Sequence, residues 1–117
     1  MATIAKQRLS AETTSGESSV LVVATATAGT ALHTAVSGTS DMDEIFLYAN
    51  NIHTSQVTLT LEWGNATANR NVKINIDPNE TVLVAPGWLA NDGNAIAAFC
   101  SVASVVNIHG FVNRITS

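Results

Sequence analysis

Apolar and polar residues alternate along several short stretches of this chain, most regularly between residues 57 and 63. The apolar positions are Val57, Leu59, Leu61 and Trp63, and the polar positions are Thr58, Thr60 and Glu62. Because successive side chains of a β-strand point to opposite faces of its sheet, this pattern predicts a strand with one buried and one solvated face. Residues 72–76 alternate in the same way, with Ile74 and Ile76 on the predicted core side and Lys73 and Asn75 on the other.

Similar strand-like runs recur along the rest of the chain, with turn signals between them. They cover residues 20–26, 31–36, 44–49, 81–85, 95–102 and 105–115. Asp77-Pro78-Asn79-Glu80 and Asn91-Asp92-Gly93-Asn94 are typical of tight turns, because these residue types fit the backbone angles that turns require. About eight short strands without a helical stripe predict an all-β fold, an antiparallel β-sandwich or jelly-roll-like domain.

Residues 1–18 do not share this periodicity. The stretch mixes small and polar side chains, and period-two alternation begins only at Ser19. We therefore expect an extended N-terminal arm over residues 1–18, with at most one short strand near residues 8–11, and a β-sandwich domain over residues 19–117. An extended arm has backbone donors and acceptors that can add to the sheet edge of a partner.

The composition narrows the classes of partner. The chain has 117 residues, enough for one domain, and only 12% of them are charged, about half the usual share. Its net charge is −4, and its five basic residues are scattered instead of forming the basic stripe that neutralises phosphates. We expect no nucleic acid or membrane partner, since the apolar runs are also too short to span a bilayer. The N-terminus lacks the apolar core of a secretory signal, which favours synthesis in a cytoplasm.

No catalytic or metal-binding motif stands out. His33, His53 and His109 lie in separate predicted elements, so we expect surface histidines and no metal site. The acidic cluster at residues 41–44 lacks the ligand spacing of a calcium loop and is expected to be a solvated loop. No serine sits in a Gly-x-Ser-x-Gly motif. The sequence therefore predicts no enzymatic activity, no catalytic residue and no cofactor.

The candidate interface residues are Lys6, Arg8 and Trp88. Lys6 and Arg8 are the cations of the arm, and Trp88 follows Pro86-Gly87, where a large aromatic side chain either closes the core or anchors an interface. Trp63 ends the most regular strand on its apolar side and is expected in the core. The single Cys100 lies in an apolar run and is expected to be buried.

Three segments of the chain carry a resemblance to a known group of proteins. They are Asp43-Glu44-Ile45-Phe46-Leu47-Tyr48-Ala49-Asn50, Val57-Thr58-Leu59-Thr60-Leu61-Glu62-Trp63-Gly64 and Gly110-Phe111-Val112-Asn113-Arg114-Ile115. Over residues 31–115 the chain resembles small virion structural proteins of tailed bacteriophages, above all capsid decoration (cement) proteins. The resemblance implies a β-sandwich that is built into the virion, in symmetric clusters on the capsid shell, and that binds the major capsid protein. It also implies that an N-terminal arm grips the shell or a neighbouring copy. The low charged fraction and the apolar residues on short strands predict self-association, as a closed ring or a trimer.

Two other functions fit the same sequence. A tail or neck component of a phage, such as a fibre or adaptor subunit, has similar sequence features. A carbohydrate-binding β-sandwich would use Trp88 and Tyr48 as stacking platforms, although the chain has few aromatic residues.

Overall fold

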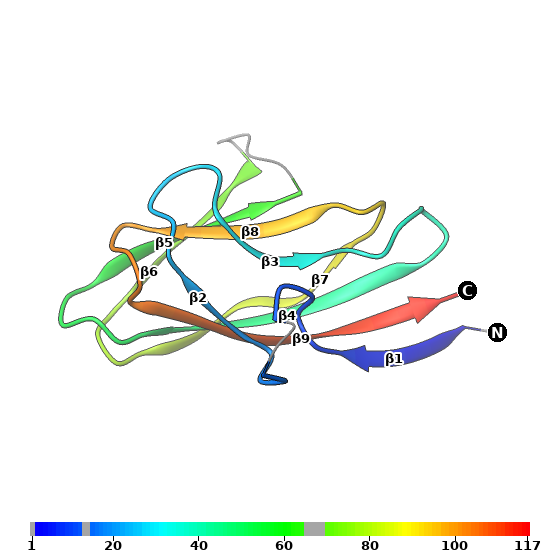
Figure 1. The fold of residues 1–117 in the computed structure, drawn as a ribbon, viewed down its shortest axis with the longest axis horizontal. Coiled ribbons are helices and arrows are strands. Elements are labelled where there is room, and N and C mark those ends of the chain that lie inside the picture. Colours follow the sequence, from blue (N-terminus) through cyan, green and yellow to red (C-terminus); the bar gives the residue numbers. More distant parts are fainter. Residues whose placement is uncertain (1, 13–14, 65–69) are drawn as a thin grey trace.

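A computed structural model describes residues 2–12, 15–64 and 70–117 and shows an all-β fold (Figure 1). Nine strands form two antiparallel sheets that pack face to face as a sandwich, and the described residues contain no α-helix. The predicted fold class is therefore confirmed. Among the described residues there is no helix of the length and hydropathy needed to cross a membrane.

The two sheets differ in size. The five-stranded sheet has the order β1 (Thr3–Gln7), β9 (Val106–Thr116), β4 (Met42–Asn51), β7 (Thr81–Ala90), and β2 (Ser19–Val22) also pairs with β9. The four-stranded sheet has the order β3 (Thr30–Thr34), β8 (Ala95–Cys100), β5 (Val57–Trp63), β6 (Val72–Ile76). The two termini lie together at one end of the molecule, where Thr3 pairs with Thr116 (Figure 1).

The inner faces of the two sheets form one hydrophobic core. Leu59, Leu61 and Ile76 are fully buried and Ile74 is partly buried against them, which confirms the predicted inward face of β5 and β6. Ile45, Leu47 and Ala49 of β4 and Ile108 and Val112 of β9 supply the opposite wall. Cys100 is also fully buried, as expected.

The polar side of β5 is not solvated, contrary to the prediction. Glu62 is only 4% exposed, because residues 23–29, which connect β2 to β3, lie against it. The hydroxyl of Thr27 donates to Glu62 Oε2 at 2.8 Å, and the backbone N–H of Gly29 donates to Oε1 at 2.6 Å. A Cβ at residue 29 would lie 2.7 Å from the Ala98 carbonyl group, so the connection can lie this close only with glycine there. Thr60, between Lys73 and Phe99 of the neighbouring strands, is also buried.

Strand β7 is longer than expected. It was predicted to end before Pro86, but it continues to Ala90 and therefore includes Trp88. Its pairing with β4 shifts register between Ile45 and Phe46, beside the proline, and again between Leu47 and Tyr48. Proline is tolerated here because β7 is an edge strand, where a missing N–H breaks no ladder.

The N-terminal segment belongs to the sandwich and is not a free arm. Residues 3–7 form β1, and their backbone groups pair with β9 of the same chain. Leu9 is fully buried in the core. The backbone N–H of Ala11 donates to the Leu32 carbonyl at 3.2 Å, and Thr34 N–H donates to Ser10 Oγ at 2.7 Å. One buried leucine in a polar stretch produces no period, which is why the alternation pattern places the boundary at Ser19.

Two truncations should separate the roles of this segment. Deleting residues 2–7 removes β1, whose five side chains are all exposed, and should leave the sandwich folded with a small loss of stability. Deleting residues 2–12 also removes Leu9, which should cost about 2–5 kcal/mol, as other buried leucines do on removal. Urea unfolding of both proteins, with Leu9→Ala in the full chain as the control, measures this. Equal destabilisation by the two deletions would show that β1 itself holds the fold.

Candidate functional site

A buried carboxylate ties the two sheets together near the end of the sandwich where the termini lie. Asp43 on β4 is fully buried and accepts two hydrogen bonds from Arg114 on β9, from Nε to Oδ1 at 2.8 Å and from Nη2 to Oδ2 at 2.9 Å. His33 Nε2 lies 2.8 Å from Oδ2, and the backbone N–H of Val36 donates to the same oxygen at 3.0 Å. The fork of the arginine matches the carboxylate, which makes this the strong form of ion pair.

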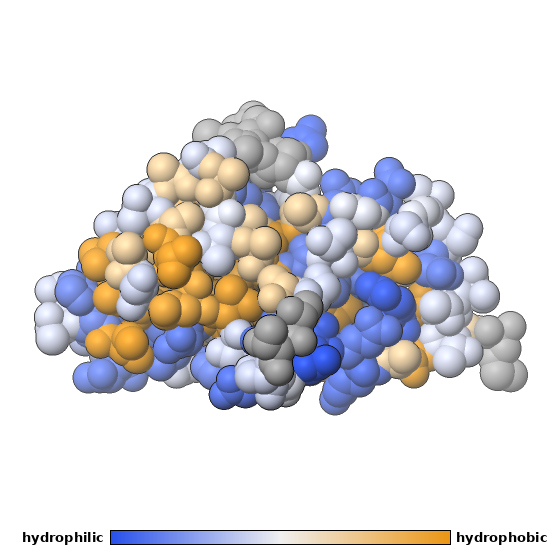
Figure 2. Space-filling view, in the orientation of Figure 1, coloured by the Kyte–Doolittle hydropathy of each residue, from blue (hydrophilic) through white to orange (hydrophobic). Residues whose placement is uncertain are grey.

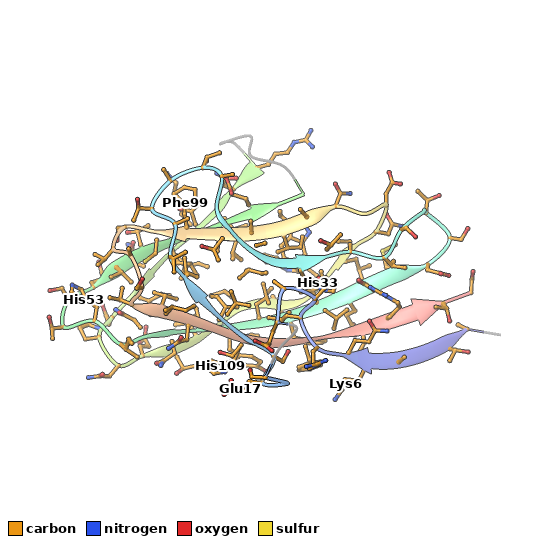
Figure 3. All side chains as sticks on the ribbon, viewed as in Figure 1. Lys6, Glu17, His33, His53, Phe99 and His109 are labelled. Atoms are coloured by element: carbon orange, nitrogen blue, oxygen red, sulfur yellow. The ribbon has the colours of Figure 1, made fainter. Side chains whose placement is uncertain are left out.

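This network corrects two expectations. His33 was expected at the surface and residues 41–44 in a solvated loop, yet His33 lies between the two sheets (Figure 3) and Asp43 faces inward. The reason is that β4 begins at Met42, so its alternation carries Asp43 to the same side as Ile45. In the pairing of β4 with β9, Asp43 lies directly opposite Arg114.

His33 is held by both ring nitrogens. The backbone N–H of Ser10 donates to Nδ1 at 3.0 Å, so Nδ1 is an acceptor and Nε2 carries the proton that it donates to Asp43. Neither nitrogen is left to exchange a proton with a bound molecule. The network therefore links the N-terminal segment, β3, β4 and β9, and its geometry is that of a structural tie.

The partners of Asp43 also set its acidity. Burial alone would raise the pKa of Asp43, but the hydrogen bonds from Arg114 and His33, the positive charge of Arg114 and the Val36 N–H together outweigh burial and lower it. The pKa of Arg114 is raised in turn, mainly by its hydrogen bond to Asp43.

Acid should therefore weaken the fold through Asp43. A carboxyl group whose pKa is lower in the folded than in the unfolded chain contributes stability above the unfolded value, here near 3.8, and this contribution is lost as the pH falls through the folded value. We expect the urea midpoint of the wild type to fall progressively below about pH 5. Asp43→Asn, which has no such proton to take up, should show a shallower dependence. Identical slopes for the two proteins would contradict the lowered pKa.

A second candidate site lies on the outer face of the five-stranded sheet, where aromatic side chains of neighbouring strands lie side by side. Phe46 of β4 pairs with Phe111 of β9, and their rings stack at 4.8 Å between centroids with 16° between planes. Lys6 Nζ on β1 lies 4.6 Å from the centroid of the Phe111 ring. On the other side, Gly87 of β7 has a φ of +92°, and a Cβ there would lie 3.0 Å from Phe46 Cζ, so glycine leaves room for the ring. We call Lys6, Phe111, Phe46 and Gly87 the aromatic band.

Exposed apolar side chains flank the aromatic band on this face. Tyr48 is 38% exposed beside Leu83, which is 45% exposed, and Leu21 and Ile4 are 40% and 67% exposed. The outer face of the four-stranded sheet instead presents polar residues such as Thr58, Lys73 and Asn75. Lys6 and His109 lie on the outside of the five-stranded sheet and Phe99 on the opposite outside (Figure 3). Exposed apolar side chains gathered on one face of a sheet are typical of an interaction surface.

A further apolar area lies at one edge of the sandwich. Figure 2 shows apolar side chains gathered over β2 and the adjoining ends of β8 and β9. Val23, directly after β2, is 55% exposed there, and Val102 and Val105 are partly buried against the core. Exposed apolar side chains therefore lie both on the outer face of the five-stranded sheet and at its β2 edge.

Of the candidate interface residues, Lys6 and Arg8 line one surface pocket, and Trp88 lies elsewhere, on β7. Lys6 belongs to the aromatic band, and Arg8 is exposed in the bend between β1 and the buried Leu9. Trp88 lies opposite the inward-facing Ile45 and contacts Trp63 edge to face at 5.5 Å between centroids. Trp63, expected in the core, is only partly buried against it.

The pair of stacking platforms considered for a carbohydrate is not formed. Tyr48 lies three residues after Ile45 on β4 and therefore projects from the opposite face to Trp88. Of the described residues, no three His, Cys, Asp or Glu side chains come close enough together to hold a metal ion. No protein family and no curated protein matches this chain.

Proposed function

We propose that the protein is a structural protein of a bacteriophage virion, a capsid decoration (cement) protein that stabilises the head shell through protein–protein contacts. The observation that carries this proposal is the aromatic band and its apolar neighbours on the outer face of the five-stranded sheet. The resemblance of residues 31–115 to phage decoration proteins supports the same assignment.

The aromatic band suits a rigid contact surface. Phe46 and Phe111 are already fixed against each other, and Gly87 and Lys6 hold the outer sides of the two rings. Side chains that are ordered before binding lose little conformational entropy when they are covered, so more of the burial energy appears as affinity. Aromatic residues are also enriched at the centres of protein interfaces.

The partner we propose for this face is the major capsid protein. The chain has a net charge of −4, and Lys6 places a positive charge on the aromatic band itself, where an acidic site on the shell would pair with it. β1, which carries Lys6, is an edge strand to which a strand of the shell or of a neighbouring copy can add. Identical copies on a symmetric shell would form closed homo-oligomers such as trimers.

Two charge reversals on opposite sheets test this proposal. Lys6→Glu should weaken binding to phage heads purified without this protein about tenfold, because it replaces an attractive charge with a repulsive one at the contact. Lys73→Glu makes the same change on the four-stranded sheet and should have little effect. Co-sedimentation with heads at low and high salt measures both, and circular dichroism checks folding.

The outcomes separate the possible partners. The loss caused by Lys6→Glu should shrink as salt is added, since salt screens exposed charges. Binding of Lys6→Glu at the wild-type level, or an equal loss for Lys73→Glu, would exclude this face as the contact. Binding of the wild type to isolated tails and not to heads would identify a tail or neck component.

A further inference from the structure

A cavity of about 340 Å³ lies where the ends of β5 and β7 meet at one edge of the sandwich. The residues of its lining that matter for binding are Trp63, Gly64, Arg70, Leu89, Asn91 and Asn94. Its volume falls in the range of small-molecule sites, and such sites combine an aromatic wall with a few polar groups. The aromatic band belongs to the outer face of the five-stranded sheet, and none of its residues lines this cavity.

The two asparagines present carbonyl oxygens. Asn91 Nδ2 donates to the Asp41 carbonyl at 3.1 Å, and Asn94 Nδ2 donates to the Asn91 carbonyl at 2.9 Å. These bonds fix the orientation of both amides, and neither Oδ1 accepts a hydrogen bond from another described residue. Gly64 has a φ of +83°, and a Cβ there would lie 3.3 Å from Asn94 Oδ1. Glycine at residue 64 therefore places no side chain of its own against that oxygen.

The aromatic wall and the positive charge of the cavity come from Trp63 and Arg70. Trp63 Nε1 donates to the Leu89 carbonyl at 3.4 Å, and the Trp63 and Trp88 rings meet in a T-shaped contact, so the indole is held in one orientation. Arg70 is exposed, and among the described residues it forms no ion pair with a carboxylate. A guanidinium in this state is suited to a carboxylate that arrives with a ligand.

We propose that this cavity binds a sugar ring that carries a carboxylate, as in a uronic acid unit. The apolar C–H face of the ring packs on Trp63, ring hydroxyls donate to Asn91 Oδ1 and Asn94 Oδ1, and the carboxylate pairs with Arg70. This site is independent of the proposed attachment to the shell, because it uses a different part of the surface and none of the same residues.

The site is tested by titrating the protein with pairs of neutral and acidic sugars and following the fluorescence of Trp63. The full chain with Trp88→Phe keeps Trp63 as its one fluorophore, because the sequence has two tryptophans. This protein is titrated with methyl glycosides of glucose, galactose and mannose and of the three corresponding uronic acids. We expect a saturable change in Trp63 fluorescence with at least one uronate, and binding about tenfold weaker for its neutral counterpart, since a charged hydrogen bond contributes that much.

Variants show whether the proposed residues act as stated. Arg70→Gln should remove the preference for the uronate and leave weak binding of both sugars, while Arg8→Gln, an exposed arginine outside the cavity, should bind as the parent does. Asn94→Ala should weaken both sugars together, because it removes a hydroxyl acceptor. The proposal is overturned if none of the six sugars changes the Trp63 signal, or if Arg70→Gln keeps the full preference for the uronate.

Discussion

Replacing Asp43 with alanine is expected to lower the free energy of unfolding by about 3–5 kcal/mol, the range seen when one partner of a buried ion pair is removed. The carboxylate is fully buried and accepts from Arg114, His33 and the Val36 N–H. Alanine leaves the Val36 N–H and His33 Nε2 without an acceptor and Arg114 without its counter-charge. Each of these donors then bears its desolvation cost uncompensated.

Two comparisons make this result specific. Asp77→Ala removes a carboxylate whose hydrogen bond to Gln56 is exposed, and it should change stability by no more than about 0.5 kcal/mol. Arg114→Ala should cost less in the Asp43→Ala protein than in the wild type, because the two residues share one interaction. Urea unfolding measures all of these proteins. A loss below about 1 kcal/mol for Asp43→Ala would show that the network is not a structural tie.

Replacing Leu61 with alanine is expected to cost about 2–5 kcal/mol, as other large-to-small core substitutions do. Leu61 is fully buried on β5, between Val72 of β6 and Ala98 of β8. The strands on both sides restrict how far the structure can collapse into the cavity left by the removed atoms. The lost packing is therefore only partly recovered.

Leu83→Ala is the matched control for Leu61→Ala. Leu83 has the same side chain but is 45% exposed on the outer face of the five-stranded sheet, so its removal should cost less than about 1 kcal/mol. Both proteins are compared by thermal and urea unfolding. A loss below about half a kcal/mol for Leu61→Ala would contradict the inward orientation of β5.

Period-two alternation determined the parts of the fold that the sequence predicted well. The limits of β5 and β6 and the inward side of Leu59, Leu61 and Ile76 follow from it directly. It could not predict that Glu62 is buried, because a separate connection folds over that face and supplies Thr27 and Gly29 as partners. It could not place β1 either, since β1 is exposed on both faces and shows no alternation of burial.

The Asp43 network and the aromatic band both depend on strand register, which the alternation of apolar and polar residues does not determine. Asp43, His33 and Arg114 belong to three strands, and only the pairing of β4 with β9 brings the acid opposite the arginine. The same pairing brings Phe46 beside Phe111, and the pairing of β1 with β9 brings Lys6 over the Phe111 ring. The sequence shows Asp43 at the start of one predicted strand and Arg114 in the last one. It does not show that the two side chains lie opposite each other.

Electron microscopy of virions that carry a labelled copy of the protein tests the central proposal most directly. A compact tag placed at residue 117, beside the exposed β1 end, would mark each copy without covering the aromatic band. We expect symmetric density on the outside of the head, with the five-stranded sheet facing the major capsid protein. Label confined to the tail or neck, absent from the virion, or attached through the four-stranded sheet would contradict the account.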